Sequence, residues 1–80
     1  MVDGLVPIER LEAGQFARIG RVDGHLDHVH RLRELGLHGG TEIEIYQPGN
    51  PCIIRMAGNK VCIRSDSRLN VFVRPHGGKN

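Results

Sequence analysis

Residues 31–46 read RLRELGLHGGTEIEIY, and the spacing of apolar residues changes from helical to strand-like within this stretch. Before the change, apolar residues recur every three positions, at Leu26, Val29, Leu32 and Leu35. After it, isoleucine alternates with glutamate over 42–45, as in a strand with one buried face. Gly36 stands between the two patterns, where glycine ends helices because it adopts positive φ without steric cost. The sequence therefore predicts a helix over about 26–35 and a strand over 41–47.

The composition favours one small globular domain with an aliphatic core. The chain has 80 residues, of which 39% are apolar and only 4% aromatic. Its formal net charge of +2 gives no strong preference for nucleic acid. No apolar run approaches the roughly 20 residues of a membrane span, and the first residues lack the pattern of a signal peptide. We therefore expect a cytoplasmic protein with no direct insertion into a membrane.

The two cysteines, Cys52 and Cys62, are expected to stay reduced. A tight turn over 57–60 would pair Met56 with Val61. In that hairpin Cys52 lies on the face of the buried aliphatic residues and Cys62 on the opposite face, so the two side chains do not meet disulfide geometry. Structural zinc sites usually place cysteines two to four residues apart, so this pair is not expected to hold a metal either.

The remaining pattern predicts further short strands joined by turns. Beyond the helix and the first strand pattern, the predicted elements are a strand over 16–22, hairpin strands over 52–56 and 60–64, a 3₁₀ turn over 65–70 and a last strand over 71–73. A sheet of this size would expose its edges unless it curled into a barrel. The predicted fold class is therefore mainly β: a small barrel of five to six short strands with one α-helix and a short 3₁₀ turn.

Several motifs stand in the order found in one known family. Leu11 to Gly14 form an L-x-x-G turn, and residues 31–37 form the helix end R-L-x-E-L-G-L. Gly40 then precedes T-E-I-E-I, and Pro51-C-I-I with Gly58 gives the hairpin. From Ile8 to Val73 the chain therefore resembles the ferrous-iron transport protein A (FeoA-like) family.

This resemblance implies an SH3-like β-barrel over 8–74, with an N-terminal arm over 1–7 and a flexible tail over 75–80. Free-standing members are cytosolic accessory proteins that act on the cytoplasmic GTPase domain of a ferrous-iron membrane transporter. The protein would then be peripheral to the inner membrane through that transporter. The same domain also occurs in metal-dependent repressors, but no helix-turn-helix precedes it here, so the stand-alone function is expected. The family defines no catalytic residue, so the chain is expected not to be an enzyme.

A docking surface is the expected functional feature. Leu32 and Leu35 are predicted to seal one end of the barrel. Leu37 lies in a glycine-rich turn, where it is expected either to contact a partner together with Leu26, Arg31 and Arg33 or to fold back onto the core. Other open alternatives are a homo-oligomer and a metal-sensing module that works with a transcriptional regulator.

The histidines form the candidate metal site. His25, His28 and His30 lie within six residues, and imidazole is a common ligand of divalent transition metals. On a helix, His25 and His28 share a face, whereas His30 points elsewhere and pairs with Glu34. We expect the protein to require no cofactor; a weak Fe²⁺ or Zn²⁺ site at His25 and His28 is the alternative.

Three other functions fit the sequence poorly. The glycines at 36, 39, 40 and 58 are assigned to turns, because a phosphate-binding P-loop needs a Lys-Ser/Thr pair at the start of a helix. A proline-peptide groove and a single-stranded nucleic-acid site both need aromatic platforms, and the chain has only Phe16, Tyr46 and Phe72. No nucleic-acid partner is therefore expected, and duplex binding through arginines such as Arg64 and Arg68 is a minor alternative.

Overall fold

The structure is a computed structural model that describes residues 4–66 and 69–78. Its elements are β1 (Val6–Pro7), η1 (Ile8–Arg10), β2 (Gln15–Gly24), α1 (Leu26–Glu34), β3 (Glu42–Gln47), β4 (Cys52–Met56), β5 (Asn59–Ile63) and β6 (Leu69–Gly78). Within the described residues the strands form one antiparallel sheet in the order β1-β6-β2-β3-β4-β5. The mainly β, SH3-like fold that the sequence predicts is therefore confirmed.

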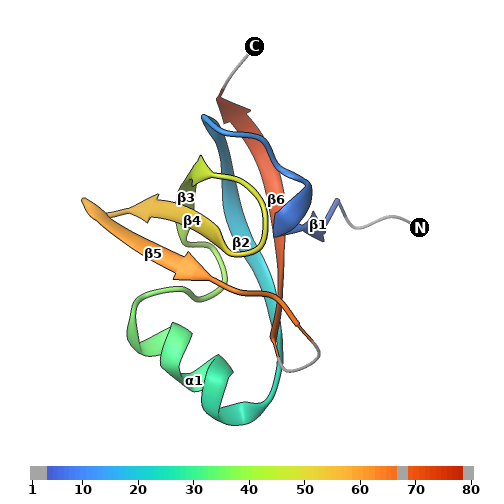
Figure 1. The fold of residues 1–80 in the computed structure, drawn as a ribbon, viewed down its shortest axis with the longest axis vertical. Coiled ribbons are helices and arrows are strands. Elements are labelled where there is room, and N and C mark those ends of the chain that lie inside the picture. The colour runs from blue at the N-terminus through green and yellow to red at the C-terminus, as the bar shows by residue number, and fades with distance from the viewer. Residues whose placement is uncertain (1–3, 67–68, 79–80) are drawn as a thin grey trace.

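The sheet curls so that one face of nearly every strand points inward. α1 lies beyond β5 at one end of the molecule, and the C-terminus leaves at the other end (Figure 1). The interior is aliphatic, as the composition predicts. Its largest fully buried side chains are Ile8, Leu37, Ile43, Ile45, Ile54, Ile63, Val71, Val73 and Cys52.

Strand β2 is long and bent, and it connects the two halves of the sheet. Its first half pairs with β3, and its whole length pairs with β6. The register with β6 shifts twice, between Phe16 and Ala17 and again after Ile19, as bulges do where a strand bends. Gly20 follows the second bend, where an added Cβ would collide with the side chain of Leu5. The absence of a Cβ at Gly20 lets the side chain of Leu5 pack directly against β2.

The predicted hairpin exists, but its predicted register is wrong. Met56 pairs with Asn59, not with Val61. The turn therefore has two residues, Ala57 with φ of 49° and Gly58 with φ of 82°, which suits the positive φ values of a tight hairpin turn. A shift of two residues leaves every side chain on its predicted face, because side chains alternate with a period of two.

Both ends of the fold differ from the expectation. β6 begins at Leu69 and continues to Gly78, where the sequence predicted a strand over 71–73 and a frayed tail from 75. At the other end, β1 pairs with β6 and η1 follows it directly. The apolar pattern missed the extension of β6 because residues 74–78 carry no apolar alternation and are held in place by pairing with β2. The boundary that the sequence analysis placed between the barrel (8–74) and the tail (75–80) therefore falls inside this strand.

The predicted 3₁₀ turn over 65–70 is not where the structure has its 3₁₀ helix. That helix is η1, at Ile8–Arg10. Around the predicted turn, Asp66 and Leu69 form an isolated antiparallel bridge, and residues 67–68 lie outside the described part of the chain. No helix among the described residues has the length and apolar character needed to cross a bilayer.

Candidate docking surface

Both ends of α1 are capped, and the helix ends just before Gly36 as the sequence predicts. At the start, the backbone N–H of Asp27 donates to Nδ1 of His25 at 3.3 Å. At the end, the N–H of Gly36 donates to the carbonyl of Arg33 at 3.0 Å, and the N–H of Leu37 donates to the carbonyl of Leu32 at 2.9 Å. These two bonds and the φ of +100° at Gly36 make a Schellman motif.

This helix end directs Leu37 into the core, where it is 1% exposed. Leu37 is therefore not a partner contact, and the alternative that it folds back onto the core is correct. Leu32 seals the barrel as predicted and is 6% exposed, but Leu35 is 51% exposed and does not. Leu26, at the first position of α1, is 77% exposed and available to a partner.

Helix geometry explains why only the middle of the apolar stripe is buried. Three residues advance about 300° around a helix, so each step of three falls about 60° short of a full turn. The stripe from Leu26 to Leu35 therefore winds around the helix, and its two ends lie on opposite flanks. Only Leu32 is buried and Val29 half-buried, because these two face the sheet.

The two flanks border different hollows, each of about 250 Å³. On one flank, His28 and Arg31 face Cys62 and Arg64, which lie on and just after β5. On the other flank, Arg33 lies near His38 in the loop before β3. The structure therefore separates Arg31 from Arg33, which the sequence grouped in one contact.

The two candidate metal ligands do lie together. The rings of His25 and His28 are 5.9 Å apart between centroids and meet edge to face at 74°. Nδ1 of His25 also lies 3.8 Å from a carboxylate oxygen of Asp27. Among the residues that the structure describes, no group of three His, Cys, Asp or Glu side chains could hold a metal ion. His30 pairs with Glu34 at 3.6 Å, as predicted.

The cysteines are both free, and their surroundings differ strongly. Cys52 is buried and Cys62 is exposed, as the face pattern predicts. Burial of Cys52 raises its pKa from 9.0 to about 11, with smaller contributions from Glu9 and Cys62. Its thiol therefore stays neutral near pH 7 and serves as an apolar core group.

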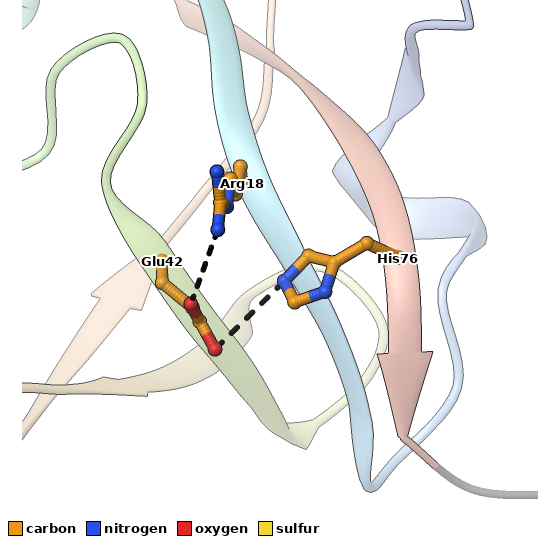
Figure 2. A network of polar contacts seen from close by, with 3 residues as sticks. All are labelled: Arg18, Glu42 and His76. Carbon is orange, nitrogen blue, oxygen red and sulfur yellow. Dashed lines mark ion pairs between the residues drawn. The ribbon is translucent and has the colours of Figure 1, made fainter.

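A basic cluster that the sequence pattern did not reveal lies on three neighbouring strands (Figure 2). Arg18 on β2 stands directly opposite Glu42 on β3 and, on its other side, opposite Arg74 on β6. Glu42 approaches Arg18 at 4.0 Å and Nε2 of His76 at 3.8 Å. Arg74 and His76 lie beside β2 because β6 continues past Val73. The sequence predicted that this last strand ends at 73, so it could not reveal the cluster.

Comparison with known proteins agrees with this fold. A family model described as the FeoA domain matches residues 6–75. The crystal structure of an iron uptake regulatory protein (FeoA) superimposes with a TM-score of 0.71 and 25% sequence identity, over 90% of this chain and 97% of that chain. Among curated protein sequences, none matches the chain significantly.

Proposed function

The chain belongs to the FeoA domain family, and on that premise we propose that it regulates ferrous-iron uptake by binding the cytoplasmic GTPase domain of a membrane iron transporter. Membership of the family indicates an accessory protein of ferrous-iron transport, in a family whose members are non-catalytic. The proposed location is the cytoplasm, with attachment to the inner membrane through the transporter.

The observation that carries the proposal is the family match over residues 6–75, almost the whole described structure. The structural match to an iron uptake regulatory protein, over 90% of this chain, supports it independently. A protein that acts without chemistry of its own must act by contact, and exposed apolar and arginine side chains favour contacts.

The outer surface of α1 is the proposed contact. Leu26 is the most exposed large apolar residue described, and Arg31 is exposed on the same helix. Neither residue seals the core, since Leu32 and Leu37 do so. Their replacement should therefore change binding without unfolding the barrel.

Calorimetric titration of the full chain into the purified soluble GTPase domain tests this proposal. Wild type should bind saturably, and Leu26→Ser and Arg31→Glu should each weaken binding by roughly tenfold or more, the size of a central interface contact. Thermal melts should show that both variants remain folded. The absence of any binding by folded wild-type protein would refute the proposal.

Two variants elsewhere serve as matched controls. Arg10→Glu reverses one charge on η1, and Tyr46→Ser removes an exposed apolar side chain that is 47% exposed on β3. Both should bind the GTPase domain as wild type does. If the controls weaken binding as much as the α1 variants do, the contact lies elsewhere or depends on net charge alone.

Metal sensing is the second candidate function, and the proximity of the His25 and His28 rings favours it. Titration with Fe²⁺ under anaerobic conditions, and with Zn²⁺, measures it directly. Micromolar or tighter binding that is lost in His28→Ala would support sensing. Millimolar binding that survives His28→Ala would remove this candidate and leave docking.

A further inference from the structure

A groove made of two adjoining hollows gathers basic side chains on the surface of the described residues. The first, of about 490 Å³, has Arg18, Arg74 and His76 in its walls. The second, of about 250 Å³, lies against α1 and has Arg33 and His38 among its lining residues. Gly20 and Gly39 belong to the walls of both hollows, so the two form one groove across the middle of β2 and the α1–β3 loop.

The lining of this groove contains no aspartate or glutamate among the described residues, and two carboxylates that reach its cations, Glu42 and Asp23, come from outside the lining. Two other hollows each include an acidic residue, Glu12 in one and Asp66 in the other. The chain as a whole has 11 basic and 9 acidic side chains, so its small net charge hides this separation. A cleft lined by one sign of charge concentrates ligands of the opposite sign.

The first hollow places like charges against each other. Arg18 and Arg74 are direct cross-strand partners on β2 and β6. Like charges directly opposite each other in a sheet repel, and nearby carboxylates offset that repulsion. Glu42 supplies one carboxylate, which reaches both Arg18 and His76 (Figure 2).

The position of Glu42 shows that Arg18 and His76 can face one carboxylate together. Its two carboxylate oxygens lie 4.0 Å from Arg18 and 3.8 Å from His76, both longer than a charge-assisted hydrogen bond of about 2.8 Å. The Glu42 side chain is 54% exposed, and such loose surface pairs contribute little. Glu42 therefore leaves hydrogen-bonding capacity at Arg18 and His76 for a carboxylate that comes from outside.

The second hollow offers a separate cation. Arg21 is already paired with Asp23 at 2.8 Å and lies over the ring of Phe72. Arg33, in contrast, makes no ion pair with any residue that the structure describes. Gly20 and Gly39, which line both hollows, lie between Arg33 and the Arg18 cluster and place no side chain of their own in the groove.

We propose that this groove binds an extended acidic segment of a protein partner, with one carboxylate at Arg18 and His76 and another at Arg33. The inference does not depend on the identity of the transporter partner. The groove favours a peptide over nucleic acid, because no Phe, Tyr or Trp side chain lines it to stack on bases. It also has few cations compared with the six to ten phosphate contacts of a typical DNA-binding surface.

Amide NMR of the full chain tests the proposal. The probe is a short peptide rich in Asp and Glu, and the comparison is the same peptide with Asn and Gln in their place. The acidic peptide should shift the amide signals of Gly20, Gly39 and Gly40 saturably at low ionic strength, and added salt should weaken the effect. The amide-bearing peptide should leave these signals unchanged. Equal shifts with both peptides would overturn the proposal.

Single substitutions locate the contact. Arg18→Ser and Arg33→Ser should each weaken the acidic peptide roughly fivefold, as expected for loss of one exposed charge pair. Arg10→Ser makes the same change in net charge outside the groove and should leave affinity within about twofold. Equal weakening by Arg10→Ser would mean that net charge, and not the groove, attracts the peptide.

A fourth variant blocks the groove without changing its charge. A Cβ at Gly39 would meet only the carbonyl oxygen of Gly20, at 3.9 Å, and the position has no positive φ, so Gly39→Leu should fold. Its side chain should lie between the two hollows and weaken the peptide as much as either arginine variant does. A DNA oligonucleotide is the remaining comparison: tighter binding of DNA than of the acidic peptide, at the same glycine signals, would contradict the assignment.

Discussion

Gly36 joins the helix to the rest of the fold, and two features restrict what can replace it. Its φ of +100° strains any residue with a Cβ, and an added Cβ would lie 3.0 Å from Cε of Met56. Gly36→Val should therefore lower the free energy of unfolding by about 1–3 kcal/mol. Chemical denaturation measures this change. Gly39→Val is the control, since Gly39 has no positive φ and more space; equal losses in the two variants would contradict the role of Gly36.

Cys52 should make stability depend on pH in the alkaline range. Its pKa is raised to about 11 in the folded protein, from 9.0 for an ordinary thiol, mainly because burial disfavours the thiolate. As pH rises above 9 the unfolded chain loses this proton first, so folding stability falls until the folded thiol also ionises near pH 11. The loss attributable to Cys52 should be on the order of 2–3 kcal/mol.

The difference between wild type and Cys52→Ala isolates this effect, because all other titrating groups are common to both. Unfolding free energies measured from about pH 7 to about pH 11 should converge as pH rises. A constant difference across that range would show that the thiol is not shifted. At about pH 8, a thiol reagent should label Cys62 in the folded protein and leave Cys52 unmodified.

Single-residue properties were largely predictable where they depend on the direction of a side chain. Alternation along the hairpin placed Cys52 inside and Cys62 outside, and it did so despite the wrong register. The conformation of Gly36 followed from its place at the end of a helical pattern. The contacts of Arg18 were not predictable, because they depend on which residues of β6 lie beside it.

In α1 and the turn that follows it, some side chains stabilise the barrel and others face solvent. Leu32 and Leu37 are buried, so replacement of either by alanine should cost about 2–5 kcal/mol. Leu26→Ala should change stability by no more than about 0.5 kcal/mol, because its side chain is 77% exposed. Thermal or chemical unfolding of the three variants checks this order. A loss at Leu26 as large as that at Leu32 would contradict the helix orientation.

The helix and strands were predicted with unequal success, and each difference from the structure has its own cause. α1 and β3 were predicted closely, because their apolar residues follow the helix and strand periods. The burial of Leu35 was predicted wrongly, since a strict three-residue repeat winds around a helix and does not stay on one face. The extension of β6 to Gly78 was missed because pairing with β2, and not an apolar pattern, holds that segment.

For the whole molecule, fold and family were predictable and the surface was not. The order of motifs from Leu11 to Gly58 indicated the FeoA-like family, and the family match over residues 6–75 confirms it. The basic groove arises only when the sheet brings β2, β6 and the α1–β3 loop together. No segment of the sequence carries that feature alone, so it required the structure.

Uptake of radioactive ferrous iron by cells that lack this protein is the decisive experiment for docking through α1. Wild-type protein should restore uptake, and so should Arg10→Glu. Folded Leu26→Ser and Arg31→Glu should fail to restore it, because each removes a side chain through which α1 is proposed to hold the transporter. Full restoration by both α1 variants, at equal protein levels, would show that the protein does not act through this helix.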